Sequence, residues 1–251
     1  MLHITNHSKI APSPGRVIIF WLGGAGFLIK YADGFSICID PYLSDSVERL
    51  CGFKRLHLSP INADDLRFDV LFITHEHADH LDEDSIDMLI SRNPNAAVYA
   101  PQSCDEILSS HGIKYVSVLA GQKIDINSLK TTVINADHGD LSLFAVGYIF
   151  EKSGRVIYHT GDTCYDNKIF KSAIKLKPDI ILPCINGAYG NLNEQQSAKL
   201  VARCNPVHAI PMHFGLFKEH GGDVKKFATI VKELSIKSKV HILAVGEGIE
   251  I

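Results

Sequence analysis

Short apolar runs rich in β-branched residues alternate along the chain with segments of helical period. The first three runs, at residues 16–22, 27–31 and 35–39, predict strands. Glycine-rich stretches at residues 23–26 and 32–34 separate them and are typical of tight turns. Strands that follow one another through short turns pair antiparallel, so we expect an antiparallel beginning.

Later parts of the chain mix strands with helices. Helices are predicted at residues 82–92, 193–204 and 223–234, where apolar side chains recur on one face. Further strands are predicted at residues 70–74, 97–100, 114–118, 131–136, 145–151, 155–160, 180–183, 207–211 and 240–244. We find no repeat and no linker, and therefore expect a single α/β domain over residues 1–251, with sheets packed together and helices outside.

The segment 41–67 has mixed polarity and no clear period. A long irregular connection in a compact domain is often functional, although a surface excursion with short helices fits equally well. Its basic side chains, Arg49, Lys54 and Arg55, suit either phosphate recognition or a solvated surface.

Composition and charge restrict the class of protein. Hydrophobic residues make up 46% of the 251 residues and charged residues 21%, which is ordinary for a globular chain. The net charge of −3 does not favour nucleic acid or an anionic membrane as a partner, so we expect a small-molecule substrate; a homo-oligomer is compatible with the sequence. Six scattered cysteines, no signal-like start and no long apolar run predict a reduced, cytoplasmic protein.

The densest cluster of metal-binding side chains is His75-Glu76-His77-Ala78-Asp79-His80, between a predicted strand and a predicted helix. In an extended segment the side chains at 75, 77 and 79 project to one side, and His80 can reach back toward them. Three further candidates, His138, Asp162 and His213, each follow a predicted strand. Imidazole and carboxylate groups are good ligands for manganese and zinc.

These motifs resemble those of the metallo-β-lactamase superfamily, and Asp40 in Ile39-Asp40-Pro41 matches its first, structural motif. The resemblance implies an αββα sandwich of two mainly antiparallel sheets packed face to face, with helices outside. It also implies two divalent metal ions. The first would be bound by His75, His77 and His138, the second by Asp79, His80 and His213, and Asp162 would bridge them.

Two metals can share a water and lower its pKa, so that a metal-bound hydroxide acts as the nucleophile. Manganese is favoured, with zinc or iron as alternatives. Asp79 could also take the proton of that water. Asp137 and His159 neighbour predicted ligands and are either partners of ligand imidazoles or ordinary polar residues. Cys164 is interpreted as a packed thiol rather than a nucleophile.

Residues 182–193 and 211–223, together with 21–27 and 40–45, resemble the L-ascorbate-6-phosphate lactonase branch of the superfamily. That branch opens a lactone ring on a phosphorylated sugar acid, using manganese, in the bacterial cytoplasm. Asn186, Tyr189 and Asn191 offer amide and hydroxyl groups that suit sugar hydroxyls. His220 either donates a hydrogen bond to a phosphate or acts as a general acid, or it is a solvent-facing loop residue.

Two other functions remain open from the sequence. The first is a phosphodiesterase or nuclease of the same fold, which is disfavoured because the chain has no basic balance. The second is a non-catalytic metal-binding module, which is disfavoured because all seven ligand positions carry metal-binding side chains. We therefore predict a metal-dependent hydrolase.

Overall fold

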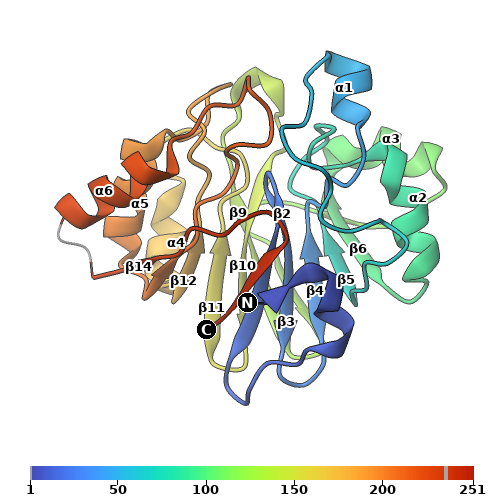
Figure 1. Ribbon diagram of the computed structural model, residues 1–251, viewed down its shortest axis with the longest axis horizontal. Helices are drawn as coiled ribbons and strands as arrows, with labels where there is room; N and C mark the ends of the chain where they lie inside the picture. Colours follow the sequence, from blue (N-terminus) through green and yellow to red (C-terminus); the bar gives the residue numbers. More distant parts are fainter. Residues whose placement is uncertain (1, 235–236) are drawn as a thin grey trace. The chain divides into compact units, whose positions relative to one another are not determined.

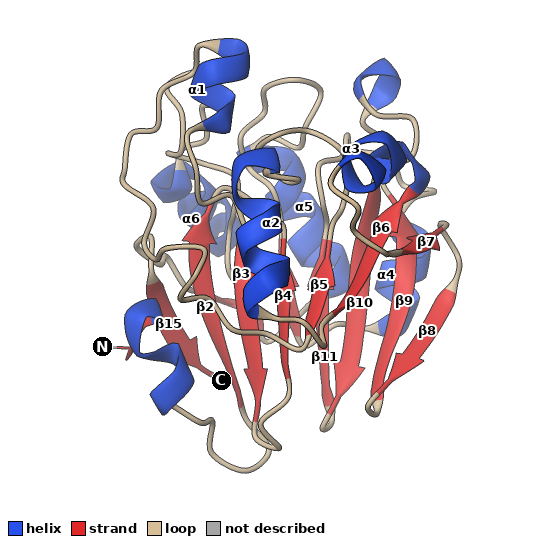
Figure 2. Cartoon of the chain, turned by 90° about the vertical axis from the view of Figure 1, so that its right-hand side faces the viewer, coloured by secondary structure: helices blue, strands red, loops and turns tan. Residues whose placement is uncertain are grey.

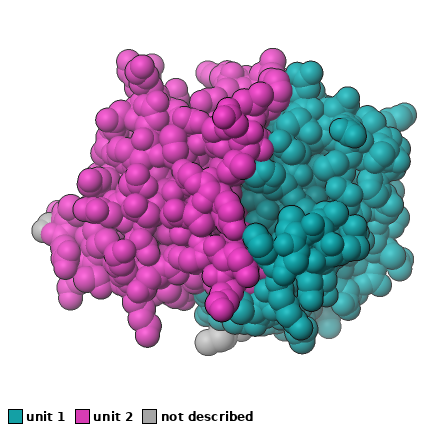
Figure 3. All heavy atoms as spheres, turned by 90° about the horizontal axis from the view of Figure 1, so that it is seen from above, with its two compact units in different colours: residues 1–118, 243–251 teal, residues 119–242 magenta. Residues whose placement is uncertain are grey.

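The computed structural model describes residues 2–234 and 237–251. The chain divides into two compact units (Figure 3). Unit 1 is Met1–Val118 with Leu243–Ile251, and unit 2 is Leu119–Ile242. A single domain over the whole chain stays a prediction.

Unit 1 contains a mixed sheet of eight strands in the order β1-β15-β2-β3-β4-β5-β6-β7. The pairs from β1 to β4 are antiparallel, and those from β4 to β7 are parallel. The strands span β1 (Leu2–His3), β2 (Val17–Gly23), β3 (Gly26–Tyr31), β4 (Ser36–Ile39), β5 (Val70–Phe72), β6 (Ala97–Pro101), β7 (Val116–Val118) and β15 (Glu247–Glu250).

The main helix of unit 1, α2 (Glu83–Arg92), lies over the strands β3 and β4 of its sheet (Figure 2). Acidic Glu83 and Asp84 occupy its first turn, where they complement the helix dipole. Its apolar Ile86 and Leu89 are buried in the core of this unit. The shorter helices of the unit are α1 (Ser46–Cys51), α3 (Asp105–Ser110) and the 3-10 turns η1 (Ile4–Lys9) and η2 (Gln102–Cys104).

Unit 2 contains a mixed sheet of seven strands in the order β14-β13-β12-β11-β10-β9-β8. The pairs from β8 to β11 are antiparallel, and those from β11 to β14 are parallel. The strands span β8 (Lys123–Ile126), β9 (Leu129–Asn135), β10 (Val146–Lys152), β11 (Arg155–His159), β12 (Ile180–Leu182), β13 (His208–Ala209) and β14 (Lys239–Val240).

The helices of unit 2 are α4 (Phe170–Leu176), α5 (Glu194–Cys204), α6 (Val224–Glu233) and the 3-10 turn η3 (Gly139–Leu141). Helices α5 and α6 pack side by side, with α4 against α5 (Figure 1). A capping box starts α5, because the Asn193 side chain accepts from Gln196 N and the Gln196 side chain accepts from Asn193 N. Among the described residues, no helix has the length and apolar character needed to cross a bilayer.

The fold agrees with the predicted class in its two sheets and accompanying helices, with one correction. Only one half of each sheet is antiparallel, because later strands are joined by helical crossovers, which place consecutive strands parallel. Strands β1, β8 and β15 and helices α3 and α4 were not predicted, since each is short. Helix α1 lies in the segment 41–67, where short helices were one of the two alternatives.

The connection between β4 and β5 includes residues 41–67 and is held by hydrogen bonds. The buried Asp82 carboxylate accepts from the Leu43 and Ser44 backbone and from the Ser44 and Ser46 hydroxyls. The Arg55 guanidinium donates to the carbonyls of Tyr42 and Ser44 and stacks over the Tyr42 ring. Arg49 pairs with Asp84 of α2. Arg49 and Arg55 therefore have structural partners within unit 1.

Candidate metal centre

The first four predicted ligands follow β5 in a tight turn of unit 1. His75 and His80 are buried, and His77 and Asp79 are half-buried. The backbone N–H groups of His80 and Leu81 both donate to the His77 carbonyl at 2.8 Å, so the segment turns from His77 onward instead of staying extended. This turn brings Nε2 of His75 to 2.9 Å from Nδ1 of His77 and Nε2 of His80 to 3.7 Å from Oδ2 of Asp79.

Asp40 and Thr74 support this turn from the adjacent ends of the parallel strands β4 and β5. The Asp40 carboxylate is fully buried and accepts from Thr74 N at 2.8 Å and Thr74 Oγ1 at 2.6 Å. Its Oδ2 atom also lies 2.8 Å from Nδ1 of His80. This contact favours the tautomer of His80 with the proton on Nδ1, and it leaves Nε2 as the metal-binding nitrogen.

The other three predicted ligands lie in unit 2, on the loops that follow β9, β11 and β13. These strands run in the same direction, so their carboxyl ends meet at one edge of the sheet. His138, Asp162 and His213 are all buried there. Oδ2 of Asp162 lies 3.3 Å from Nε2 of His213 and 3.9 Å from Nε2 of His138. Asp162 is thus the carboxylate that the two imidazoles share.

His213 has a left-handed backbone with φ of 60°, which is unusual for a residue with a side chain. Such strain persists where the surrounding structure fixes it, and it is concentrated at functional sites. The preceding residue is held to the neighbouring loop by the parallel bridge between Cys184 and Met212.

His220 is buried beside His213 in unit 2. The two rings stack with centroids 4.7 Å apart and an angle of 12°. The Phe217 and Tyr189 rings meet His220 edge-on, at 4.7 and 6.0 Å. The solvent-facing alternative for His220 is therefore wrong, because its side chain packs against aromatic rings and is 5% exposed.

The three predicted substrate residues differ in their surroundings. Tyr189 has left-handed φ of 53° and is 46% exposed. Asn191 is buried, and its amide Nδ2 donates to Oδ2 of Asp162 at 2.6 Å. Asn186 is also buried, but neither its amide nitrogen nor its amide oxygen has a hydrogen-bond partner among residues 2–234 and 237–251.

Asp137 links two of the metal-ligand loops of unit 2. Its carboxylate accepts from Gly139 N at 3.1 Å and from the Cys164 thiol at 3.2 Å, and its carbonyl accepts from Cys164 N at 2.7 Å. Partial burial and the adjacent Asp137 raise the pKa of Cys164 to about 11. The thiol is protonated at neutral pH, which agrees with a packed thiol. His159 is fully buried, and its Nδ1 accepts from Gly161 N at 3.2 Å.

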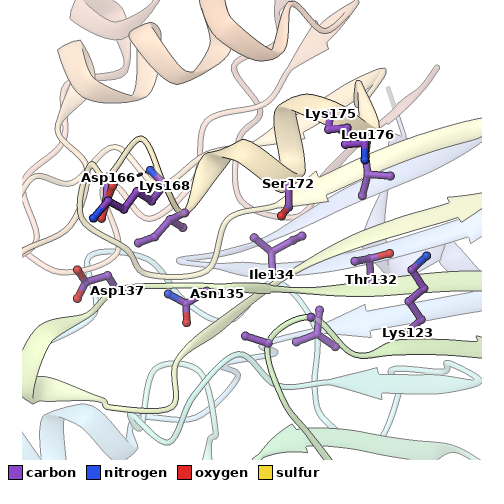
Figure 4. Close-up of a pocket in the computed structure, with 14 residues that line it drawn as sticks. Lys123, Thr132, Ile134, Asn135, Asp137, Asp166, Lys168, Ser172, Lys175 and Leu176 are labelled. Atoms are coloured by element: carbon purple, nitrogen blue, oxygen red, sulfur yellow. Dashed lines mark hydrogen bonds between the residues drawn. The ribbon is translucent and has the colours of Figure 1, made fainter.

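A cavity of about 690 Å³ lies within unit 2, between β9 with the start of β8 on one side and α4 with the segment leading into it on the other (Figure 4). Its lining includes Lys123, Lys168 and Lys175, as well as Asp137. None of the seven predicted ligands lines this cavity, so it is distinct from the predicted metal centre.

Sequence reasoning missed the contacts of two polar residues. Thr74 was included only as the end of a strand, although its hydroxyl also lies 3.1 Å from Nδ1 of His75 and 3.2 Å from Nδ1 of His80. Its position directly before the first histidine was the available signal. The contact between Asn191 and Asp162 gave no signal in the sequence, because the two residues are distant along the chain.

Comparison with known proteins identifies the family. The model of the Beta-lactamase superfamily domain matches residues 18–213. The chain belongs to this superfamily. A UPF0173 metal-dependent hydrolase of Aeropyrum pernix is 31% identical to this chain over 247 residues. The match covers 92% of this chain and 96% of the relative. One from Methanopyrus kandleri is 29% identical over 242 residues, covering 92% and 99%.

Solved structures share the fold of this chain. Igni18, a metallo hydrolase from Ignicoccus hospitalis, aligns with a TM-score of 0.78 at 22% identity over 94% of this chain and 98% of its own. An isothiocyanate hydrolase from Delia radicum gut bacteria aligns with a TM-score of 0.75 at 22% identity, covering 92% and 98%. These findings confirm the predicted fold. The chain is a metal-dependent hydrolase of the metallo-β-lactamase fold.

Proposed function

We propose that the ligand groups of the two units together hold two divalent metal ions. His75, His77 and His138 would bind the first ion, and Asp79, His80 and His213 the second, with Asp162 bridging both. The observation that carries the proposal is the clustering of buried imidazole and carboxylate groups within each unit. Charged groups buried in proteins are paired or coordinate a metal ion.

The donor set fits the proposed ions. Five imidazoles and two carboxylates suit manganese, zinc or iron, and manganese is the favoured candidate. The carboxylates would partly neutralise the charge of the two ions. The support for His80 as a ligand is its Nδ1 contact with Asp40, which favours an available lone pair on Nε2.

When bound, the two ions would activate a water as the nucleophile and stabilise negative charge that develops on a substrate oxygen. Asp79 is half-buried at the edge of the histidine turn, where its carboxylate could accept the proton of the attacking water. His220 would donate a proton to the leaving group, and stacking on His213 fixes its ring. Asp40, Asp137 and His159 would hold the ligand loops in place.

The proposed substrate is the lactone of a small phosphorylated sugar acid, such as L-ascorbate 6-phosphate, in the cytoplasm. The support is the resemblance of residues 182–193 and 211–223 to the corresponding lactonase segments, together with the buried amides of Asn186 and Asn191. The net charge of −3 disfavours long polyanions, whose binding needs many phosphate contacts. A small-molecule substrate is therefore favoured over a nucleic acid.

The test is a comparison of turnover by manganese-loaded protein on four substrates: a phosphorylated lactone, benzyl isothiocyanate, a simple phosphodiester and a short RNA. We expect the lactone to be hydrolysed fastest. The isothiocyanate is included because a structural neighbour is named for that activity.

Two further measurements complete the test. His220→Ala should lower turnover of the lactone at least tenfold while metal content stays unchanged, since general acid–base groups contribute about 10²–10⁴-fold. Glu219→Ala is the control, because Glu219 is the exposed neighbour of His220. Faster cleavage of RNA or phosphodiester than of the lactone would contradict the proposed substrate.

A further inference from the structure

The loop of residues 183–193, between β12 and α5, carries two buried asparagines whose amides are incompletely bonded. We call it the asparagine loop. Asn186 is 6% exposed and Asn191 is 5% exposed. In the part of the chain that the structure describes, neither amide atom of Asn186 has a hydrogen-bond partner, and Oδ1 of Asn191 has none. One buried donor group and two buried acceptors are therefore available on this loop.

The loop backbone is held in place by bridges and hydrogen bonds. Asn186 is bridged to Asn193, and Gly187 to Gly221. Gly187 N donates to the Leu192 carbonyl. A Cβ atom at Gly222 would lie 3.2 Å from Cα of Asn186 and 2.8 Å from Cβ of Phe214. The absence of a side chain at Gly222 allows this close packing against Asn186.

A buried amide without hydrogen-bond partners lowers the stability of the folded state. A buried donor or acceptor without a partner destabilises the fold, and nearly all such groups in proteins are bonded. An apolar residue of similar size would fill the same space without this cost. The presence of an asparagine is thus explained if a ligand supplies the missing partners.

The chemistry of the loop indicates what that ligand group is. An amide that both donates and accepts matches a hydroxyl, which does the same. Phosphate is instead typically recognised by arginine or lysine, whereas the Asn191 amide donates to the Asp162 carboxylate. A carboxylate beside the subsite disfavours an anionic ligand group.

We infer that Asn186, with Oδ1 of Asn191, forms a subsite that recognises a neutral hydroxyl group of the substrate. The inference rests on the proposed function in placing that substrate beside Asp162. It assigns specificity for hydroxyl-bearing molecules to the asparagine loop, and it places any phosphate of the substrate outside this subsite.

The first arm of the test separates recognition from a structural role. Asn186→Leu replaces the amide by an apolar group of similar size, and we expect the melting temperature to rise by about 2–6 °C, because an unsatisfied group is removed. Asn93→Leu is the matched control. Asn93 is 7% exposed, but its amide is fully bonded to Leu66, Phe68 and Leu89, so its replacement should lower the melting temperature.

The second arm measures binding by calorimetry on manganese-loaded protein, with gluconate and hexanoate as probes. Both are six-carbon carboxylates, and only gluconate carries hydroxyls. Wild type should bind gluconate about tenfold more tightly, as expected for one or two hydrogen bonds. Asn186→Leu should reduce that preference to less than threefold and leave hexanoate binding unchanged. Hexanamide is a third probe, which tests whether the subsite prefers an amide group to hydroxyl groups.

In the melting assay, a melting temperature of Asn186→Leu lowered as in Asn93→Leu would overturn the inference. In the binding assay, so would the absence of a gluconate preference in wild type or a preference that Asn186→Leu leaves unchanged. Tighter binding of hexanamide than of gluconate would also overturn it. Failure of the proposed function has a different signature: no lactone turnover, with the gluconate preference still present and still dependent on Asn186.

Discussion

Asp40 is the residue whose removal tests the support of the histidine turn most directly. Its carboxylate is fully buried, accepts both the N–H and the O–H of Thr74, and lies 2.8 Å from Nδ1 of His80. Asp40→Ala deletes all three contacts at once. We expect a less stable fold and weaker metal binding.

The magnitude follows from the groups left behind. The Thr74 hydroxyl can turn toward the imidazoles of His75 or His80, at 3.1 and 3.2 Å, but the Thr74 N–H is left without an acceptor. The orphaned buried donor alone costs roughly 1–3 kcal/mol, and the two lost bonds to a charged group add to that cost. Metal affinity should fall about 10–100-fold, as for other partners of ligand histidines.

Asp40→Asn separates the two effects. The asparagine oxygen can still accept from Thr74 N, so the loss of unfolding free energy should be smaller than for alanine. The amide N–H₂, however, would donate to Nδ1 of His80 and force its proton onto Nε2, the nitrogen proposed to bind metal. Metal affinity should therefore fall as far as in Asp40→Ala.

Two assays measure these quantities. The free energy of unfolding comes from guanidinium titration followed by fluorescence of Trp21, the only tryptophan of the chain. Metal affinity comes from competition with a chelating dye. Asp69→Ala is the control, because Asp69 likewise accepts an N–H and an O–H, both from Ser36, on the same pair of strands. Manganese affinity unchanged in both Asp40 variants would refute the assigned role of Asp40.

Three further predictions concern residues of unit 2. Asp162→Ala should abolish turnover and weaken binding of both metals, as measured by elemental analysis after dialysis, because less negative charge offsets the repulsion between the ions. Cys164→Ser should keep turnover within about twofold, and iodoacetamide should react slowly with Cys164 at pH 7, since its pKa is raised to about 11. Burial, with His208 and Lys239 nearby, lowers the pKa of His241 from 6.5 to about 4. The unfolded chain takes up a proton there between those values, so stability should fall as pH drops from 6.5 to 4, by at most about 3 kcal/mol, and His241→Gln should remove this part of the loss in acid titrations.

The sequence alone determined the family and the ligand candidates. Three histidines and an aspartate within six positions after a buried strand are local information, since spacing and the strand end suffice to predict a metal-binding loop. The long apolar runs also predicted most central strands, because burial on both faces selects β-branched residues regardless of partner. Short elements at the edges, such as β8 and α1, lacked so strong a pattern.

The tertiary structure decided which polar groups meet. Asn191 and Asp162 are separated by 29 positions, and their bond of 2.6 Å exists because the loops after β11 and β12 emerge at the same edge of one sheet. The same is true of Asp40 and His80, which lie 40 positions apart. The orphaned amide of Asn186 is equally invisible in the sequence, where it is one polar residue in a glycine-rich loop. Burial and the loss of hydrogen-bond partners depend on which segments pack together in the folded chain, so they cannot be predicted from the local sequence.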